Sequence, residues 1–153
     1  MPNAWVYHTP IGALMLAEEG GALTRLLFDG CTMPGELRET PVLALAGAQL
    51  QEYFAGKRKE FTIPLALRGT PFQLEAWAAL QAVPYGETRC YKDIATQILR
   101  PLASRAVGMA NNRNPIPVIV PCHRIIGASG ALIGYAGGLE VKKQLLELEK
   151  RYV

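Results

Sequence analysis

Cysteine and histidine are scarce in this 153-residue sequence, and it contains no long hydrophobic run. Three cysteines, an odd number, exclude a complete disulfide framework, so Cys31, Cys90 and Cys122 are expected to be thiols of a reducing compartment. Charges, prolines or glycines interrupt every apolar stretch before it reaches the length of a membrane span. The first ten residues also lack the basic start and long apolar segment of a signal peptide. We therefore expect a cytoplasmic protein with no membrane partner.

Acidic side chains are absent from Ile94 to Leu139. Residues 85–153 carry ten Lys/Arg against five Asp/Glu, whereas residues 1–84 carry six against eight. A locally unopposed basic segment suits a phosphate backbone, although a solvated basic face has the same composition. The arginines inside the carboxylate-free span are Arg100, Arg105, Arg113 and Arg124. Half of all residues are hydrophobic, which suffices for one compact unit or two small subdomains sharing an interface.

The first half of the chain predicts a small sheet followed by a helix. Residues 4–28 are β-like, with Gly20-Gly21 suited to a tight hairpin turn between two apolar strands. Residues 29–40 are polar and turn-rich, and are expected to be a loop. Apolar residues then recur at helical spacing over 41–54. A domain boundary is expected near Arg68-Gly69.

The second half predicts short helices around irregular segments. Thr70-Pro71-Phe72-Gln73 has the pattern of a capping box that opens a helix ending before Pro84. Two short helices, Tyr91–Ile98 and Leu102–Asn111, predict a helix-turn-helix over residues 91–111. Prolines exclude a regular helix over 112–121. The remaining expectations are a glycine-rich loop over 127–138 and a closing helix over 139–151.

The motif at residues 120–124, Val-Pro-Cys-His-Arg, is the strongest chemical signal. A cysteine attacks as its thiolate, and a neighbouring His and Arg favour that anion. A random cysteine is more often a small buried hydrophobe, but the setting of Cys122, between a proline-punctuated segment and a glycine-rich loop, favours a nucleophile. Because adjacent side chains usually point apart, His123 is expected to act on Cys122 through a turn or a bridging water.

A catalytic base usually has its own orienting group. In the closing helix Glu149 shares the apolar stripe of Leu145 and Leu146, whereas Glu147 faces solvent. A carboxylate on a core-facing stripe needs a partner, and His123 is the candidate, although a Glu that snorkels to the helix end would fit the same pattern. Lys142 shares the stripe and is expected to snorkel to solvent.

Residues 114–126, Asn-Pro-Ile-Pro-Val-Ile-Val-Pro-Cys-His-Arg-Ile-Ile, resemble the active-site signature of the O6-alkylguanine-DNA alkyltransferases, also called methylated-DNA–protein-cysteine methyltransferases. Residues 72–91 are similar to the family's first helix, 104–108 to its recognition helix and 134–138 to its substrate loop. The resemblance is strong over residues 70–150 and weaker but consistent before them. The proline–cysteine–histidine–arginine core with its flanks is far more specific than a helix-turn-helix.

The resemblance implies an α/β domain over residues 1–68, ribonuclease-H-like, with a small antiparallel sheet and a helix. It implies a mainly α alkyltransferase and DNA-binding domain over residues 69–153, whose helix-turn-helix docks in the minor groove. The implied activity is DNA repair by direct reversal. The alkyl group of O6-alkylguanine, and of O4-alkylthymine, would pass irreversibly from a flipped-out base to Cys122, without a cofactor. One protein molecule would repair one lesion.

The same resemblance implies roles for matching residues. Cys122 would accept the alkyl group, His123 would be its water-mediated base and Glu149 would orient that histidine. Asn114 would tie the recognition helix to the active-site segment, and Tyr91 would give a proton to the departing guanine. The implied DNA contacts are Ser104, Ala106, Arg113, Arg124 and Arg105, the last entering the space of the flipped nucleotide. The implied lining of the base pocket is Pro117, Val118, Tyr135, Ala136 and Gly137.

Two positions depart from parts of the family. Ala136 stands where some members carry a hydroxyl residue, which implies a roomier, less polar pocket for bulkier alkyl groups. Only His8 and Cys31 offer soft ligands before residue 90, too few for the zinc site of some members. No metal is therefore expected.

Three other function classes fit parts of the pattern. A cysteine hydrolase built on Cys122, His123 and Glu149 would turn over many times, but it has no need for Arg105 on a small-residue helix. A module that only recognises alkylated guanine would lack the cysteine. A helix-turn-helix transcription factor would need a dimerising element, and because the sequence offers none we expect a monomer.

Overall fold

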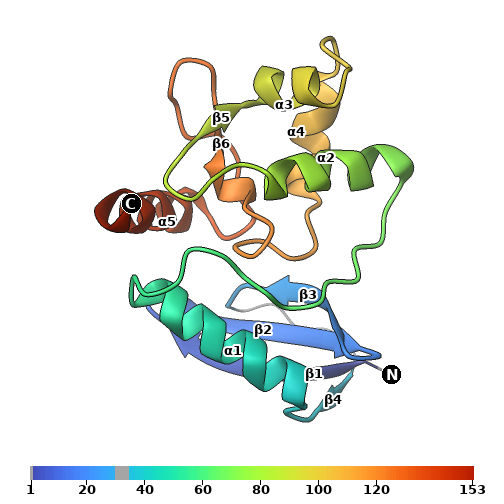
Figure 1. Cartoon of the computed structure of the whole chain (residues 1–153), viewed down its shortest axis with the longest axis vertical. Coiled ribbons are helices and arrows are strands. Elements are labelled where there is room, and N and C mark those ends of the chain that lie inside the picture. The colour runs from blue at the N-terminus through green and yellow to red at the C-terminus, as the bar shows by residue number, and fades with distance from the viewer. Residues whose placement is uncertain (1, 30–34) are drawn as a thin grey trace. The chain divides into compact units, whose positions relative to one another are not determined.

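The structure, a computed structural model, describes residues 2–29 and 35–153. Cys31, expected above to be a thiol, lies outside the described residues, whereas Cys90 and Cys122 are free thiols. The chain forms two compact units, Met1–Leu67 and Arg68–Val153 (Figure 1). Within the described part of the chain, no helix combines the length and the apolar character that crossing a membrane requires.

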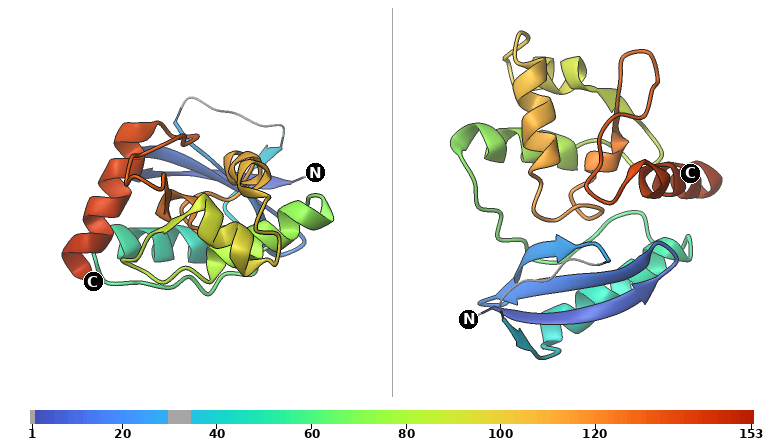
Figure 2. Two further views of the ribbon diagram at one scale, coloured as in Figure 1. Left: turned by 90° about the horizontal axis from the view of Figure 1, so that it is seen from above. Right: turned by 180° about the vertical axis from the view of Figure 1, so that it is seen from behind.

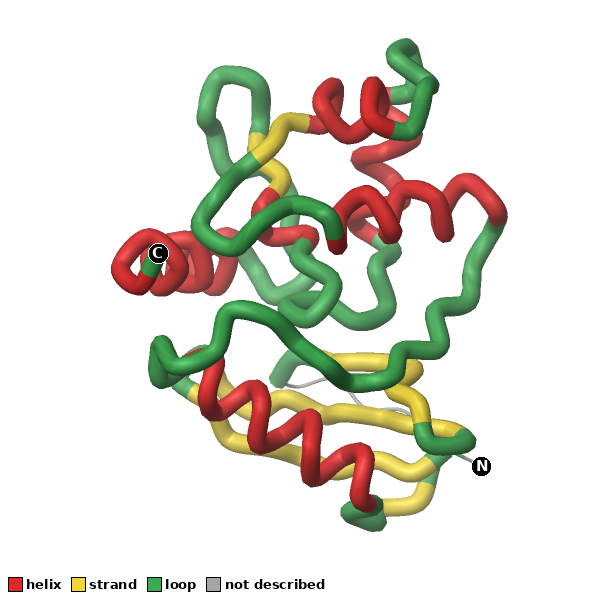
Figure 3. The backbone as a smooth tube through the Cα atoms, viewed as in Figure 1, coloured by secondary structure: helices red, strands yellow, loops and turns green. Residues whose placement is uncertain are grey.

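The first unit is a four-stranded sheet with one helix against it, in the strand order β3-β2-β1-β4 (Figure 3). Gly20 and Gly21, both at positive φ, form the turn between β2 and β3, which confirms the predicted hairpin. Leucines dominate the core that the sheet shares with α1. The elements are β1 (Asn3–Thr9), β2 (Gly12–Glu19), β3 (Ala22–Leu27), β4 (Glu36–Leu37) and α1 (Pro41–Phe54), the last as predicted.

The sheet is mixed, which corrects the expectation of an antiparallel one. β4 pairs parallel to β1, inside the segment 29–40 that was expected to be a loop throughout. Two backbone bonds flank it, from Glu36 N to Pro2 O (3.1 Å) and from Arg38 N to Ala4 O (3.0 Å). A two-residue strand made by completing the free edge of β1 leaves no periodic signal in a polar sequence, because it is too short to alternate.

The second unit is mainly helical, with a two-stranded parallel ribbon (Figure 2). The predicted capping box is confirmed: Gln73 N donates to Thr70 Oγ1 (3.1 Å) and Thr70 N to Gln73 Oε1 (2.9 Å). The segment from β6 to the last helix is a long loop, also as predicted. The elements are α2 (Pro71–Gln81), β5 (Arg89–Cys90), α3 (Tyr91–Gln97), α4 (Ser104–Asn112), the 3₁₀ turn η1 (Cys122–Arg124), β6 (Ile125–Ile126) and α5 (Leu139–Tyr152).

Helix α4 begins two residues later than predicted, after Ala103 in the N-cap position, and Leu102 stands fully in solvent. The helix is fastened to α2 by the buried Trp77, whose Nε1 donates to Ala110 O (2.9 Å). The pairing of β5 with β6 brings the start of α3 beside the segment that follows η1. These contacts hold Tyr91, the first residue of α3, near the active-site motif.

Candidate active site

Cys122 is presented by an irregular, tightly bonded segment after α4. Val118 takes a positive φ of 74°, unusual for a β-branched residue, and sets the turn. Val120 N donates to Ile116 O (2.9 Å), and Cys122 N donates to Val120 O (2.8 Å). As predicted, the prolines exclude a regular helix over residues 112–121, and these backbone hydrogen bonds hold the segment in one conformation. The Cys122 side chain is buried at the start of η1.

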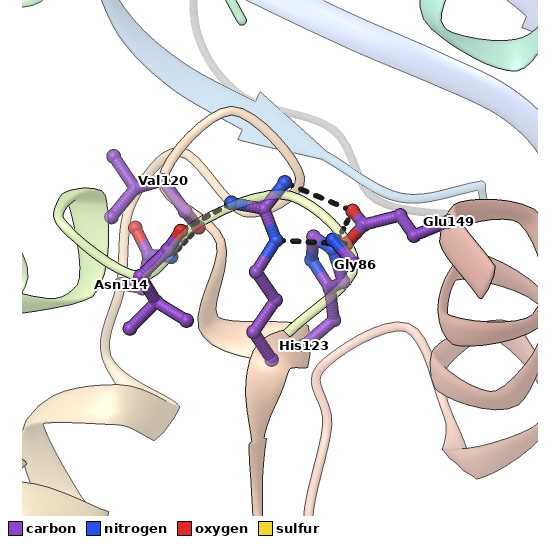
Figure 4. Close-up of polar contacts among 7 residues, drawn as sticks. Gly86, Asn114, Val120, His123 and Glu149 are labelled. Carbon is purple, nitrogen blue, oxygen red and sulfur yellow. Dashed lines mark hydrogen bonds and ion pairs between the residues drawn. The ribbon is translucent and has the colours of Figure 1, made fainter. Parts of the chain in front are cut away.

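Two asparagines stabilise this path. The side chain of Asn114 donates to Val120 O (2.8 Å) and accepts from Ile116 N (3.0 Å), so it braces the segment from inside (Figure 4). A contact from α4 itself comes from Asn111, whose Nδ2 lies 3.5 Å from Cys122 O. Asn111 was not among the predicted site residues. It is the next-to-last residue of α4 and is buried, and a polar side chain at a core-facing helix position was the available signal.

His123 and Glu149 are in direct contact, which places the expected base beside its expected orienter. His123 Nε2 and Glu149 Oε2 are 2.6 Å apart, and both side chains are buried. In Figure 4 the Glu149 side chain points toward His123 and toward Gly86. Gly86 N donates to Glu149 Oε1 (3.2 Å). Gly86 has a φ of 80°, a conformation that favours glycine, so the loop after α2 contributes to the carboxylate site.

Arg124 corrects a prediction. It was expected to contact DNA, but its side chain is buried, 8 % exposed. Its Nε donates to Glu149 Oε1 (2.8 Å), its Nη2 to Glu149 Oε2 (3.1 Å) and its Nη1 to Val83 O (2.7 Å). The planar guanidinium thus forms a bidentate pair with a carboxylate inside the protein. Sequence charge did not reveal this, because the partner lies 25 residues away.

The hydrogen on the His123–Glu149 bond can be assigned. A carboxylate only accepts hydrogen bonds, and Glu149 is the anion because the hydrogen bonds from His123 and Arg124 and the charge of Arg124 outweigh burial and hold its pKa far below its ordinary value. His123 Nε2 therefore carries the hydrogen, and Nδ1 keeps its lone pair. Nδ1 is buried and has no hydrogen-bond partner among the residues that the structure describes.

The resting charges follow from burial. Burial raises the pKa of Cys122 to about 11, and the Asn114 side chain and the Lys142 charge lower it only in part. Burial lowers the pKa of His123, Glu149 raises it, and Arg124 and Lys142 lower it. At neutral pH the site therefore holds a neutral thiol, a neutral imidazole and a carboxylate paired with a guanidinium.

Lys142 is a second correction. It was expected to snorkel to solvent, yet its side chain is fully buried. Its Nζ donates to Ile125 O (2.6 Å) and Ile133 O (2.9 Å) and lies 3.5 Å from Gly134 O. It thereby joins α5 to the glycine-rich loop. Free carbonyls in that loop make burial of the ammonium possible, and a helical stripe of residue types cannot indicate them.

The expected pocket residues lie in the same unit but differ in exposure. Tyr91 Oη is 3.4 Å from Ile133 O, and burial together with the Cys122 charge raises the pKa of Tyr91. Tyr135 is half-buried, and burial followed by the Cys122 and Glu149 charges raises its pKa. Pro117 and Val118 are buried, Gly137 is half-buried and Ala136 is exposed.

The outer face of α4 carries the other expected contacts. Arg105, Ala106 and Arg113 are exposed, and Ser104 is half-buried. Arg113 and Ala106 also line a shallow open hollow between α2 and α4. In contrast with Arg124, these groups face solvent. Among the described residues, no group of three or more His, Cys, Asp or Glu side chains could hold a metal ion.

Comparison with known proteins assigns the family. Residues 5–67 match the ribonuclease-like domain of 6-O-methylguanine DNA methyltransferase, and residues 71–151 match its DNA-binding domain. The chain belongs to this family. The resemblance read from the sequence is thereby confirmed, as are the ribonuclease-like first domain and the helical second one. The chain is a DNA-repair methyltransferase, a transferase that acts by direct reversal.

Relatives match over nearly the whole chain. The constitutive methylated-DNA–protein-cysteine methyltransferase of Bacillus subtilis is 50 % identical, covering 93 % of this chain and 92 % of its own. The Mycobacterium leprae methylated-DNA–protein-cysteine methyltransferase is 56 % identical, covering 95 % and 90 %. The crystal structure of Mycobacterium tuberculosis OGT in complex with DNA superposes with a TM-score of 0.91 at 50 % identity, covering 98 % of this chain and 94 % of that one.

Proposed function

We propose that Cys122 is the residue that takes the alkyl group of this methyltransferase, from O6-alkylguanine and also from O4-alkylthymine. The observation that carries this is the buried His123 Nδ1, an acceptor with no partner in the described part of the chain, next in sequence to a buried thiol. Glu149 fixes the tautomer that leaves this atom free. A neutral thiol needs such a base, because only its thiolate attacks readily.

The proposed reaction has three steps. The Cys122 proton passes through a bridging water to His123 Nδ1, and the thiolate attacks the alkyl carbon. The carbon–O6 bond breaks as the carbon–sulfur bond forms, and the bonding electrons leave with guanine. Tyr91, whose raised pKa keeps it protonated at neutral pH, gives its proton to the guanine, and the imidazolium proton returns to Tyr91 through solvent.

The proposed product is a thioether on Cys122. Nothing in the proposed chemistry cleaves that bond, so each molecule acts once and no cofactor takes part. The pocket is formed by Tyr135 and the main chain around Val118, and the methyl side chain of Ala136 leaves room for bulkier alkyl groups. This lining is supported by the position of the loop that Lys142 holds.

The proposed DNA contact uses α3 and α4 as a helix-turn-helix in the minor groove. Arg105 and Ala106 are exposed on α4, Ser104 is half-buried at its start, and Arg113 is exposed just after its end, where a duplex can reach them. The target carbon is buried in a base stack, so the nucleotide must be extruded at a cost of a few kcal/mol. Arg105 fills the vacated space with a planar cation. We also propose that the protein acts as a monomer in the cytoplasm.

The direct test is the intact mass of the protein after incubation with a short duplex that contains one O6-methylguanine. We expect a single methyl group on Cys122, saturating at one per molecule and absent from Cys122→Ala. Tight binding of the duplex without an adduct would leave only damage recognition. Repeated turnover without a stable adduct would instead identify a hydrolase.

A further inference from the structure

Cys122, His123, Arg124 and Glu149 form a buried centre. Arg124 is the charged group of this centre that the proposed reaction does not use. It is bidentate on Glu149, through Nε (2.8 Å) and Nη2 (3.1 Å), and its third nitrogen, Nη1, donates to Val83 O. The same carboxylate contacts His123. Glu149 therefore has two basic neighbours, one of which is always charged whereas the other can be neutral.

A buried carboxylate that faced His123 alone would hold the histidine as an imidazolium, because the opposite charge favours the protonated form. An imidazolium has no lone pair and cannot take the proton of Cys122. The site requires a Glu149 that orients His123 by hydrogen bonding without stabilising the protonated imidazolium form of His123. A permanent cation on the far side of the carboxylate satisfies both requirements.

We propose that Arg124 is a positioning residue which, by neutralising Glu149, keeps His123 in the neutral form that accepts the Cys122 proton. The catalytic importance of a neutral His123 rests on the proposed transfer to Cys122, whereas the protonation state of His123 can be measured without that transfer. Lys142 also acts on His123, but its hydrogen bonds run to main-chain carbonyl groups and not to Glu149. The other titratable groups around His123 and Glu149 are Cys122 in η1 and Tyr85 and Tyr135 in loops.

The first measurement is the protonation state of His123 by NMR of histidine-labelled protein. The sequence has two histidines, so His8→Gln assigns both sets of ring nitrogen signals. In the wild type we expect a neutral His123 with the hydrogen on Nε2 at neutral pH. In Arg124→Met we expect an imidazolium at neutral pH. In Arg124→Met combined with Glu149→Gln, which removes both charges, we expect a neutral ring again.

Two variants guard against a folding defect. Arg124→Gln keeps a donor toward Glu149 but not the charge, and should give the imidazolium as Arg124→Met does. Arg124→Lys keeps the charge but not the bidentate geometry, and should leave His123 neutral. Arg58→Met is the matched control, because Arg58 also bonds a glutamate through Nε (3.0 Å to Glu52), in the other unit. It should leave the His123 signals unchanged.

The second measurement is the rate of alkyl transfer against pH. In Arg124→Gln the acid limb of the profile should move to higher pH, with transfer below it slowed about tenfold for each unit by which the His123 pKa rises. Arg124→Lys should leave the limb in place. A neutral His123 in both Arg124→Met and Arg124→Gln would overturn the proposal. Absence of any alkyl transfer would contradict the proposed function but leave the NMR result readable.

Discussion

The carboxylate-free span from Ile94 to Leu139 contains two kinds of arginine, and the structure separates them. Arg105 is exposed on α4, and Arg113 is exposed at the residue that caps the C-terminus of α4. Arg124 is buried against a carboxylate that stands outside that span in sequence but within hydrogen-bonding distance in space. The buried centre of η1 and α5 is built to set protonation states, whereas the exposed face of α4 is free to meet phosphates.

The difference shows that local charge counts predict partners only for side chains that stay in solvent. An exposed arginine can release counterions from DNA and so contributes salt-dependent affinity. A buried one acts through the carboxylate it neutralises, and removing it leaves an unpaired charge in the interior. Variants of the two regions should therefore fail differently, in chemistry and stability at the centre and in DNA affinity at the surface.

The largest effect is expected from Glu149→Gln. It leaves the Arg124 charge buried without its partner, which costs about 3–5 kcal/mol of unfolding free energy. It also loosens the His123 tautomer, and transfer should slow by about 100-fold or more. Glu147→Gln, an exposed carboxylate on the same helix, is the matched control and should change neither quantity. Denaturant unfolding and single-turnover transfer measure the two effects.

Lys142→Met should have the next largest effect. It leaves Ile125 O without its ammonium donor, at a cost of about 1–3 kcal/mol. It also removes a charge that lowers the Cys122 pKa, so transfer should slow about tenfold for each unit of rise. Lys143→Met, its exposed neighbour in α5, serves as control. Equal rates in the two variants would show that the buried ammonium does not act on the site.

Acid should destabilise the buried centre more than the rest of the molecule. The pKa of His123 is lowered in the folded state, so its contribution to stability is lost as pH falls below about 6.5. The pKa of Glu149 is also lowered, so its contribution is present above its unfolded value and lost as pH falls below about 4.3. Thermal melting from pH 7.5 down to about 3.5 should show the His123 loss and the onset of the Glu149 loss, and Glu149→Gln should flatten the Glu149 part. A slope unchanged by Glu149→Gln would contradict the assignment.

The smallest effect is expected at the surface. Arg113→Gln should weaken duplex binding uniformly across sequences and reduce the slope of log affinity against log salt by about one. Transfer to a free O6-alkylguanine base, which needs no DNA contact, should be unchanged. Arg58→Gln in the first unit is the control for loss of one positive charge. An unchanged salt slope would place Arg113 outside the DNA interface.

Features set by neighbouring residues could be predicted from the sequence. Contacts to groups that are distant in sequence could not. The hairpin glycines, the Thr70 capping box and the closing helix follow from turn and cap chemistry, and the structure contains all three. The contact between His123 and Glu149 was predicted because a carboxylate on an apolar stripe needs a partner. The burial of Lys142 and Arg124 was missed, because their acceptors are carbonyls and a carboxylate brought close only by the fold.

The most direct test of the division between centre and surface is the ratio of two transfer rates, to a duplex carrying O6-alkylguanine and to the free O6-alkylguanine base. Arg105→Ala should lower the duplex rate and leave the free-base rate unchanged, so the ratio falls. At pH values below the acid limb of the rate profile, Arg124→Gln should lower the duplex rate and the free-base rate by the same factor, so their ratio is preserved. A preserved ratio in Arg105→Ala, or a fallen one in Arg124→Gln, would contradict the account.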